Sequence, residues 1–143
     1  MTKPAPVIIL DDDPDEHDLM KEVWKELKLS YPLISFSTGE QLLNYLQSDK
    51  QIPFLIISDI NLHPIDGFEL REKILEDESS KFKSIPFIFW SGSASEDQIK
   101  KAYDLSSHGF FIKASTFKEL KEIMTDIITY WHKSEIPYLR GQY

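Results

Sequence analysis

The sequence has no cysteine and few glycines, and each shortage excludes a class of protein. Without cysteine the chain can form no disulfide bond, no thiolate metal site and no cysteine nucleophile, which fits a reducing compartment. Five glycines in 143 residues, with 41% hydrophobic and 13% aromatic residues, exclude a fibrous or disordered composition. A chain of this length is expected to form one domain with a substantial core.

Long apolar runs and an excess of basic residues are missing as well. The first apolar run, at residues 7–10, is too short for a signal peptide or a membrane span. The chain carries 24 acidic against 16 basic side chains, and the net charge of −8 repels phosphate backbones and anionic lipid surfaces. We therefore expect a cytoplasmic protein that binds neither nucleic acid nor membranes.

What the chain does contain is a regular alternation of short apolar runs and helix-start signals. The runs predict buried strands at 7–10, 33–36, 54–58, 86–90 and 110–112. Helices are expected after Asp13, Thr38, Asp66, Ser95 and Thr116, each an N-cap with glutamate or glutamine three residues later. Since parallel neighbours need crossover connections, the alternation predicts an α/β fold, a doubly wound five-stranded parallel sheet with helices on both faces.

The residue patterns also predict where the first helix, the third helix and the folded unit end. The first helix is expected to run from Pro14 to about Leu29, with Leu19, Val23 and Leu27 on its apolar stripe. The acidic stretch 76–80 is interpreted as the solvated end of the third helix. Residues 134–143 have no helix or strand pattern, so we expect a folded unit at 1–133 and a C-terminal tail at 134–143.

Polar side chains stand where four of the predicted strands end. They are Asp11, Asp12 and Asp13 after the first strand, Asp59 after the third, Ser91 after the fourth and Lys113 after the fifth. Doubly wound sheets bind ligands outside the carboxyl ends of their strands, so these groups are expected to meet in one site.

Each of these residues also has a purely structural interpretation. Acids after the first strand favour the positive end of the following helix dipole, and Asp13 is assigned to that role as the N-cap. Taken alone, Ser91 and Lys113 are typical of a strand-end hydroxyl and a surface lysine. Asp59 is harder to explain in this way, because it directly follows a strongly apolar strand. The arrival of all these groups on corresponding strand ends favours a functional site.

The chemistry of the cluster predicts a cation and a phosphoryl group. Crowded carboxylates repel one another and so favour a bound cation. Oxygen ligands without cysteine or histidine suit a hard ion, and partial hydration suits Mg²⁺ better than Ca²⁺. A cation, a lysine and a hydroxyl together neutralise a phosphoryl group. The sequence therefore predicts a carboxylate that receives phosphate.

With these residues the chain resembles the CheY-like receiver domains of two-component response regulators, over residues 7 to about 131. The resemblance rests on the acid pair Asp11-Asp12, on Asp59 with Asp66-Gly67 seven residues later, on Ser91-Gly92, and on Lys113 after Phe110. It implies the flavodoxin-like (βα)5 fold with strand order 2-1-3-4-5 and a single-domain response regulator.

The resemblance also implies a phosphoacceptor and its metal ligands. Asp59 would attack the phosphohistidine of a sensor histidine kinase or phosphotransfer protein and become an aspartyl phosphate. Asp12, Asp59 and the backbone carbonyl of Asn61 would bind Mg²⁺, and Asp11 would reach the ion through water. The chain would not be an enzyme beyond its own phosphorylation and dephosphorylation.

A switch is implied on the neighbouring strands. Lys113 would pair with Asp59 at rest and with a phosphoryl oxygen afterwards. The Ser91 hydroxyl would be drawn to another phosphoryl oxygen, and Phe110 would turn inward. No output domain fits after Trp131, so the expected output is protein contact or onward phosphotransfer to an unknown target.

The chain departs from the family at two loops. Alanine follows Lys113 where the family usually has proline, and we expect a trans Lys113–Ala114 bond because a cis bond without proline is costly. The proline usual four residues after the acceptor is displaced by one, which leaves His63 in that position, predicted to be solvated. The other three histidines lack metal-ligand spacing and are expected at the surface: His17, His108 and His132.

Two other functions stay open. A phosphatase of the haloacid dehalogenase type would use Asp11 as nucleophile, but would leave Asp59 unexplained. A receiver-fold module could also bind its partners without phosphorylation. The last helix is apolar on more than one side, which fits either a homodimer or a deep core position.

Overall fold

A computed structural model of the protein describes residues 4–48, 51–78 and 80–139. Its strands are β1 (Val7–Leu10), β2 (Leu33–Phe36), β3 (Leu55–Asp59), β4 (Phe87–Ser91) and β5 (Phe110–Ile112). Its helices are α1 (Pro14–Leu27), α2 (Gly39–Gln47), α3 (Gly67–Glu76), α4 (Ser80–Lys83), α5 (Glu96–Asp104) and α6 (Phe117–Lys133). The strands form one parallel sheet in the order β2-β1-β3-β4-β5, which confirms the predicted fold class and strand order.

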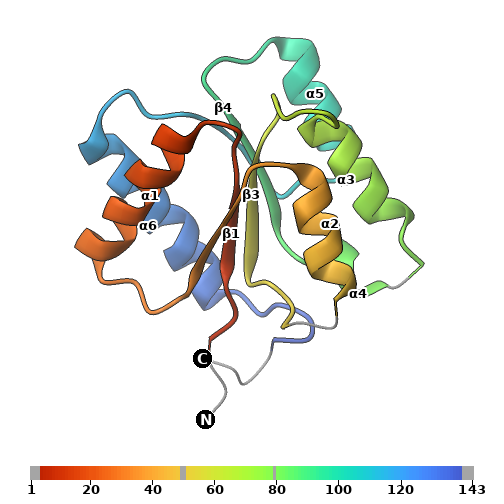
Figure 1. Ribbon diagram of the computed structural model, residues 1–143, viewed down its shortest axis with the longest axis horizontal. Helices are drawn as coiled ribbons and strands as arrows, with labels where there is room; N and C mark the ends of the chain where they lie inside the picture. The colour runs from red at the N-terminus through yellow and green to blue at the C-terminus, as the bar shows by residue number, and fades with distance from the viewer. Residues whose placement is uncertain (1–3, 49–50, 79, 140–143) are drawn as a thin grey trace.

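Helices cover both faces of the sheet, with α1 and α6 on one face and α2, α3 and α5 on the other (Figure 1). Every residue of β1 and β3 is buried, as their continuous apolar runs predict. Alternate residues of β1 face opposite ways, so Val7 and Ile9 pack in the core cluster of α1 and α6, and Ile8 and Leu10 pack in that of α2 and α3. The sheet therefore has two cores, one on each face.

The helices begin where their caps predict, and their ends differ in detail. Thr38, Asp66 and Ser95 each form a capping box with the residue three positions later. The first helix ends at Leu27, two residues earlier than predicted, because Lys28 adopts a left-handed conformation with φ of 51°. The short helix α4 begins at Ser80, within the stretch 76–80 that was predicted to be solvated. This helix was not predicted, because a single helical turn is too short to show a periodic pattern.

Strands β3 and β4 each begin and end one residue later than predicted. Asp59 and Ser91 are therefore the last residues of their strands and take part in the ladder, Asp59 opposite Trp90 and Ser91 opposite Ile112. Their backbones are thus held by the sheet.

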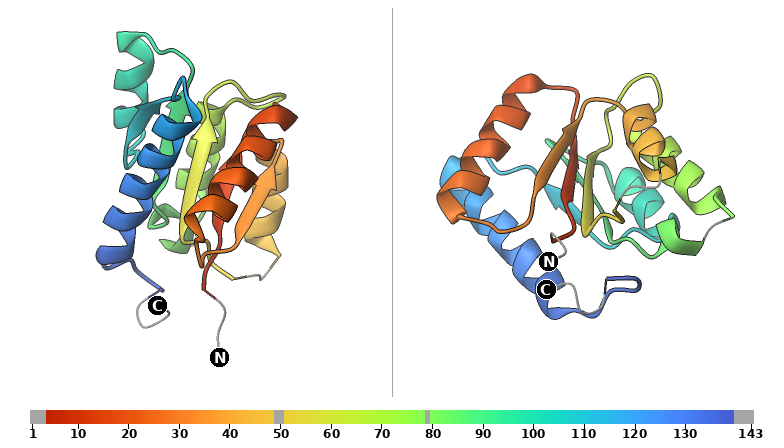
Figure 2. Two further views of the ribbon diagram at one scale, coloured as in Figure 1. Left: turned by 90° about the vertical axis from the view of Figure 1, so that its left-hand side faces the viewer. Right: turned by 60° about the horizontal axis from the view of Figure 1, so that its bottom comes forward.

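The chain after α6 crosses the end of the sheet where the strands begin (Figure 2). Residues 134–139 form neither helix nor strand, yet Ile136 and Leu139 are buried in the cluster that contains α1 and α6. The apolar side chains Leu120, Met124, Ile127 and Ile128 of α6 are buried in the same cluster, so the core accounts for that apolar face. The division into a unit at 1–133 and a tail at 134–143 stays a prediction.

His108 extends the pairing of β4 with β5 through its side chain. The Phe87 N–H donates to His108 Nδ1 at 3.0 Å, and the His108 N–H donates to the Phe87 carbonyl at 2.8 Å. A protonated imidazole has no acceptor nitrogen, so this contact requires the neutral ring. Desolvation of the ring and, secondly, the charge of the buried Arg71 lower the pKa of His108 below its ordinary value.

Acid is therefore expected to destabilise the fold through His108. Because its folded-state pKa lies below the unfolded value of 6.5, its contribution is complete above that value and is lost as the pH falls through the folded-state pKa. His108→Asn places an amide oxygen near the Nδ1 position without titrating. Urea unfolding from neutral to mildly acidic pH should show a smaller loss of stability in His108→Asn than in the wild type. Parallel pH profiles would contradict this role.

Candidate functional site

Three of the polar groups predicted to meet, those of Asp11, Asp59 and Lys113, do so at the edge where the strands end. Lys113 follows β5, and its Nζ donates to Asp11 Oδ2 at 2.8 Å and to Asp59 Oδ2 at 2.9 Å. Asp11 is 1% exposed and Asp59 is 6% exposed, so both carboxylates are screened from water. The family resemblance implied the pairing with Asp59 but not that with Asp11.

The two carboxylates determine the charge of this lysine. Burial alone would lower the pKa of the Lys113 ammonium. The hydrogen bonds and charges of Asp11 and Asp59 outweigh burial and hold that pKa above its ordinary value. Lys113 therefore stays charged across the physiological range.

Both oxygens of the Asp59 carboxylate are engaged. Oδ2 accepts from Lys113, and Oδ1 accepts from the Asn61 N–H at 2.9 Å. The Ser58 hydroxyl donates to the Asp59 carbonyl at 2.9 Å and further fixes the backbone there. A charged, oriented and largely desolvated carboxylate thus stands at the end of β3.

The three acids after β1 take different positions. Asp11 is buried, and its Oδ1 accepts the Asp13 N–H at 3.0 Å. Asp13 caps α1 by accepting the Asp15 N–H at 2.9 Å. Asp12 is exposed, and its carboxylate forms no hydrogen bond or ion pair with the residues that the structure describes. Asp12 is therefore free to take an external ligand.

The donor set fits a partly hydrated ion better than a closed cage. Within residues 4–48, 51–78 and 80–139, no group of three or more Asp, Glu, His or Cys side chains lies close enough to hold a metal ion. The carboxylates of Asp11, Asp12 and Asp59, with Glu16 nearby, outnumber the single Lys113 ammonium and leave an excess of negative charge. A divalent cation would balance this charge with Asp12, Asp59 and the Asn61 carbonyl as direct ligands and water as the remainder, an arrangement that suits Mg²⁺.

Ser91 and Phe110, predicted as the switch, lie on neighbouring strands: Ser91 ends β4 and Phe110 begins β5. Ser91 is 1% exposed and its hydroxyl donates to the Ser93 carbonyl at 2.7 Å. Phe110 is partly buried, with its ring centroid 6.4 Å from that of Phe89. The Ser91 hydroxyl is thus engaged within its own loop, and the switch stays a prediction.

Two of the expectations for the departing loops hold. The one cis peptide bond among the described residues is His63–Pro64, so Lys113–Ala114 is trans as predicted. His63 is exposed, in agreement with a solvated loop histidine.

The expectation that His17 lies at the surface is wrong. It is 9% exposed, and its Nε2–H donates to the Asp11 carbonyl at 2.7 Å. His17, Met20 and Trp24 are buried on one face of α1, whereas Leu19, predicted to be on the apolar stripe, is 43% exposed. The spacing i, i+3, i+7 was the signal that would have placed His17 inside.

Gly67 begins α3 directly against the backbone of Asp59 and Ile60. Its N–H donates to the Ile60 carbonyl at 3.0 Å, and a Cβ on Gly67 would lie 2.4 Å from the Asp59 carbonyl oxygen. Side chains cannot relieve an overlap with a backbone oxygen, so any larger residue must displace β3 or α3. Glycine is required at this position by close approach.

We expect Gly67→Ala to lower the free energy of unfolding by about 2 kcal/mol, because the added methyl group overpacks a backbone contact. Gly92→Ala is the matched control, since a Cβ on Gly92 would meet no atom within 4 Å. Urea unfolding of the two variants checks the difference. Two variants of equal stability would contradict the close contact.

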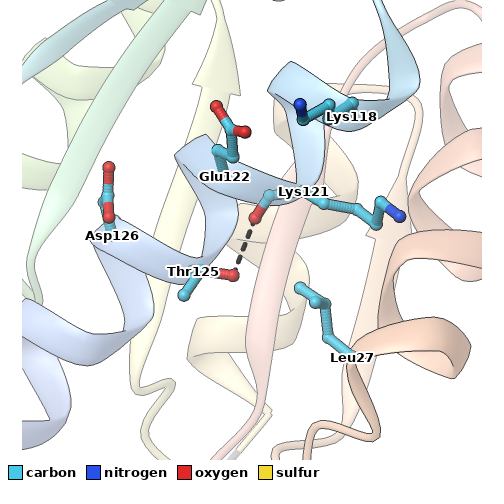
Figure 3. A pocket seen from close by; sticks show the side chains of 6 residues that line it. All are labelled: Leu27, Lys118, Lys121, Glu122, Thr125 and Asp126. Carbon is cyan, nitrogen blue, oxygen red and sulfur yellow. Dashed lines mark hydrogen bonds between the residues drawn. The ribbon is translucent and has the colours of Figure 1, made fainter.

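A groove of about 550 Å³ between α1 and α6 is separate from this site (Figure 3). It is lined by Leu27, Lys118, Lys121, Glu122, Thr125 and Asp126. The Thr125 hydroxyl donates to the Lys121 carbonyl, and the Lys121 ammonium pairs with Glu26. None of these residues belongs to the cluster at the strand ends.

Comparison with known proteins links this geometry to a family. The family described as response regulator receiver domain matches residues 7–125. The response regulator Rcp1 of Synechocystis sp. is 26% identical over 133 residues, which cover 90% of this chain and 89% of Rcp1. In the part of the chain that the structure describes, no helix has the length and hydrophobicity needed to span a membrane.

Two solved structures share the fold over nearly their whole length. The Mn²⁺-bound form of Rcp1 has a TM-score of 0.81 and 25% identity, and the match covers 94% of this chain and 99% of that chain. The phosphorylated cyanobacterial phytochrome response regulator RcpA has a TM-score of 0.83 and 24% identity, with the same coverage of 94% and 99%.

Proposed function

The chain belongs to the response regulator receiver domain family, and from this premise we propose that it accepts a phosphoryl group on Asp59 in a Mg²⁺-dependent reaction. The donor would be a sensor histidine kinase or a phosphotransfer protein in the cytoplasm. The phosphorylated chain would signal through altered protein contacts or pass the group onward. The observation that supports this most strongly is the Asp59 carboxylate, held between the Lys113 ammonium and the Asn61 N–H at the end of β3.

In the proposed reaction an Asp59 oxygen forms a bond to phosphorus while the bond from phosphorus to the donor's nitrogen breaks. The Asn61 N–H and Lys113 orient the carboxylate before attack. Lys113 would then follow the negative charge onto a phosphoryl oxygen. Mg²⁺ bound by Asp12, Asp59 and the Asn61 carbonyl would neutralise the charge of the transferred group. The Mn²⁺-bound form of Rcp1 supports the binding of a divalent ion, without identifying its ligands in this chain.

Phosphorylation would change the charge at one point by roughly −1.5 to −2 and add three acceptor oxygens. Lys113 and Ser91 would be the groups that respond, and their backbones are joined, because the Lys113 N–H donates to the Ser91 carbonyl at 2.7 Å. A shift of either residue would act on β5 and Phe110. We therefore place the readout on the surface of α5, β5 and α6.

The alternatives are not favoured by this geometry. A phosphatase with Asp11 as nucleophile would leave unexplained the Asp59 carboxylate, which Lys113 and the Asn61 N–H orient at the end of β3. A module that works without phosphorylation would have no need for a desolvated lysine on the acceptor carboxylate. Partner binding undiminished by Asp59→Ala would support that module.

The experiment that tests the proposal is the intact mass of the protein after incubation with acetyl phosphate. With Mg²⁺ we expect an increase of one phosphoryl group, and with a chelator in place of Mg²⁺ we expect none. An unchanged mass in the presence of Mg²⁺ would defeat the proposed function.

A further inference from the structure

His17 makes a directed contact with the loop that carries the site's acids. Its imidazole is more than nine-tenths buried under the loop between β1 and α1, and Nε2 lies 2.7 Å from the Asp11 carbonyl oxygen. A carbonyl only accepts hydrogen bonds, so Nε2 carries the proton and donates. The other ring nitrogen, Nδ1, is buried without a partner among the described residues. A leucine or methionine would bury the same volume without an unpaired nitrogen, so the bond to Asp11 is what distinguishes histidine here.

The contact completes the immobilisation of Asp11. The Asp11 N–H donates to the Phe36 carbonyl at 3.1 Å, Oδ1 accepts from Asp13, and Oδ2 accepts from Lys113. The carbonyl, held by His17, is the remaining polar group. Every polar atom of Asp11 is thus fixed by another part of the chain.

Asp12 differs from Asp11 in this respect. Its exposed carboxylate has no partner among the described residues, so no side-chain contact sets its direction. Asp12 is oriented by the two peptide units that flank it. The Asp13 N–H of one unit donates to Asp11 Oδ1, and the Asp11 carbonyl of the other is the atom to which His17 donates. A change at His17 would therefore leave the carbonyl of the Asp11–Asp12 peptide without its donor, while the bond from the Asp13 N–H and the ion pairs of Lys113 stay in place.

We propose that His17 is a positioning residue for the divalent metal ion: through the Asp11 carbonyl it holds the Asp11–Asp12 peptide in the orientation from which the Asp12 carboxylate binds the ion. This inference rests on the proposed function. Residues that orient metal ligands through hydrogen bonds generally influence affinity strongly although they do not touch the metal.

The test compares the Mg²⁺ affinity of two variants with that of the wild type, without any phosphodonor. His17→Leu keeps a buried apolar side chain but has no donor, and we expect its dissociation constant for Mg²⁺ to rise about tenfold. His17→Gln carries an amide N–H about as far from the backbone as Nε2, so its affinity should stay close to that of the wild type. Calorimetric titration with Mg²⁺, together with the shift of the Asn61 amide resonance, measures both.

Trp24→Phe is the matched control on the same helix. Trp24 Nε1–H donates to the Tyr31 carbonyl at 2.9 Å, so this variant also loses a buried bond from α1 to a backbone carbonyl, at the end of the helix away from the site. It should lose stability and keep its Mg²⁺ affinity. An equal loss of Mg²⁺ affinity in Trp24→Phe and His17→Leu would show that general destabilisation of α1 causes the effect, and this would overturn the proposal.

The remaining outcomes are also decisive. Unchanged affinity in His17→Leu, with wild-type protein that does bind Mg²⁺, overturns this inference alone. Wild-type protein that binds no Mg²⁺ overturns it together with the metal dependence of the proposed function. If His17→Leu does not fold, His17→Asn replaces it, because its shorter amide cannot reach the Asp11 carbonyl; its affinity should fall while that of His17→Gln holds.

Discussion

Replacing Asp59 with asparagine is expected to abolish phosphoryl uptake while the fold persists. The amide has no anionic oxygen to attack phosphorus, yet its carbonyl oxygen can still accept the Asn61 N–H. Lys113 keeps its second partner, Asp11, so no buried charge is left alone. Intact mass after incubation with acetyl phosphate and Mg²⁺ should show no adduct, and thermal unfolding should remain cooperative.

Asp13→Asn is the matched control for this experiment. Asp13 is an acid at the same edge of the sheet, but its carboxylate caps α1 and points to the Asp15 N–H. Asparagine caps helices about as well as aspartate, so the variant should fold and take up one phosphoryl group. A phosphoryl adduct on Asp59→Asn would contradict the assignment of Asp59 as the acceptor. The assignment would also be contradicted if Asp13→Asn were the variant that takes up no phosphoryl group.

Removing the charge of Lys113 is expected to have the largest effect on stability. Lys113→Met leaves the Asp11 and Asp59 carboxylates, 1% and 6% exposed, without their shared cation. Breaking a buried ion pair in this way costs about 3 kcal/mol, because the remaining charges are desolvated and uncompensated. Mg²⁺ should restore part of the loss, since it supplies positive charge at the same carboxylates. Urea unfolding with and without Mg²⁺ measures both effects.

Lys121→Met provides the comparison. Lys121 pairs with Glu26 at 3.0 Å, a distance similar to those of the Lys113 pairs, but the two side chains are 28% and 54% exposed. Solvent screens such a pair, and its loss should cost no more than about 1 kcal/mol with no dependence on Mg²⁺. Similar losses in both lysine variants, or no response of Lys113→Met to Mg²⁺, would contradict the view that Lys113 neutralises a buried acidic pair.

The sheet and its polar edge could be predicted because local patterns determine them. Continuous apolar runs identified β1 and β3, and capping residues such as Thr38 and Asp66 located the helix starts that follow strands. Once the strands are parallel, their ends meet at one edge, which brought Asp59 and Lys113 together before any coordinates were known.

Contacts between distant parts of the chain could not be predicted from these local patterns. The pairing of Lys113 with Asp11 joins residues 102 positions apart, and nothing local distinguishes Asp11 from Asp12. The burial of Leu139 depends on where α6 ends relative to the sheet. The prediction for His17 was wrong for another reason. Its polarity suggested the surface, whereas its spacing from Met20 and Trp24 places it on the buried face of α1.

The identity of the carboxylate that carries the phosphoryl group is the most direct test of the proposed function. The protein is incubated with acetyl phosphate and Mg²⁺, digested under acidic conditions that preserve acyl phosphates, and sequenced by tandem mass spectrometry. We predict the modification on Asp59, within the peptide that spans β3 and Asn61. A phosphoryl group on Asp11, or on any residue other than Asp59, would contradict it.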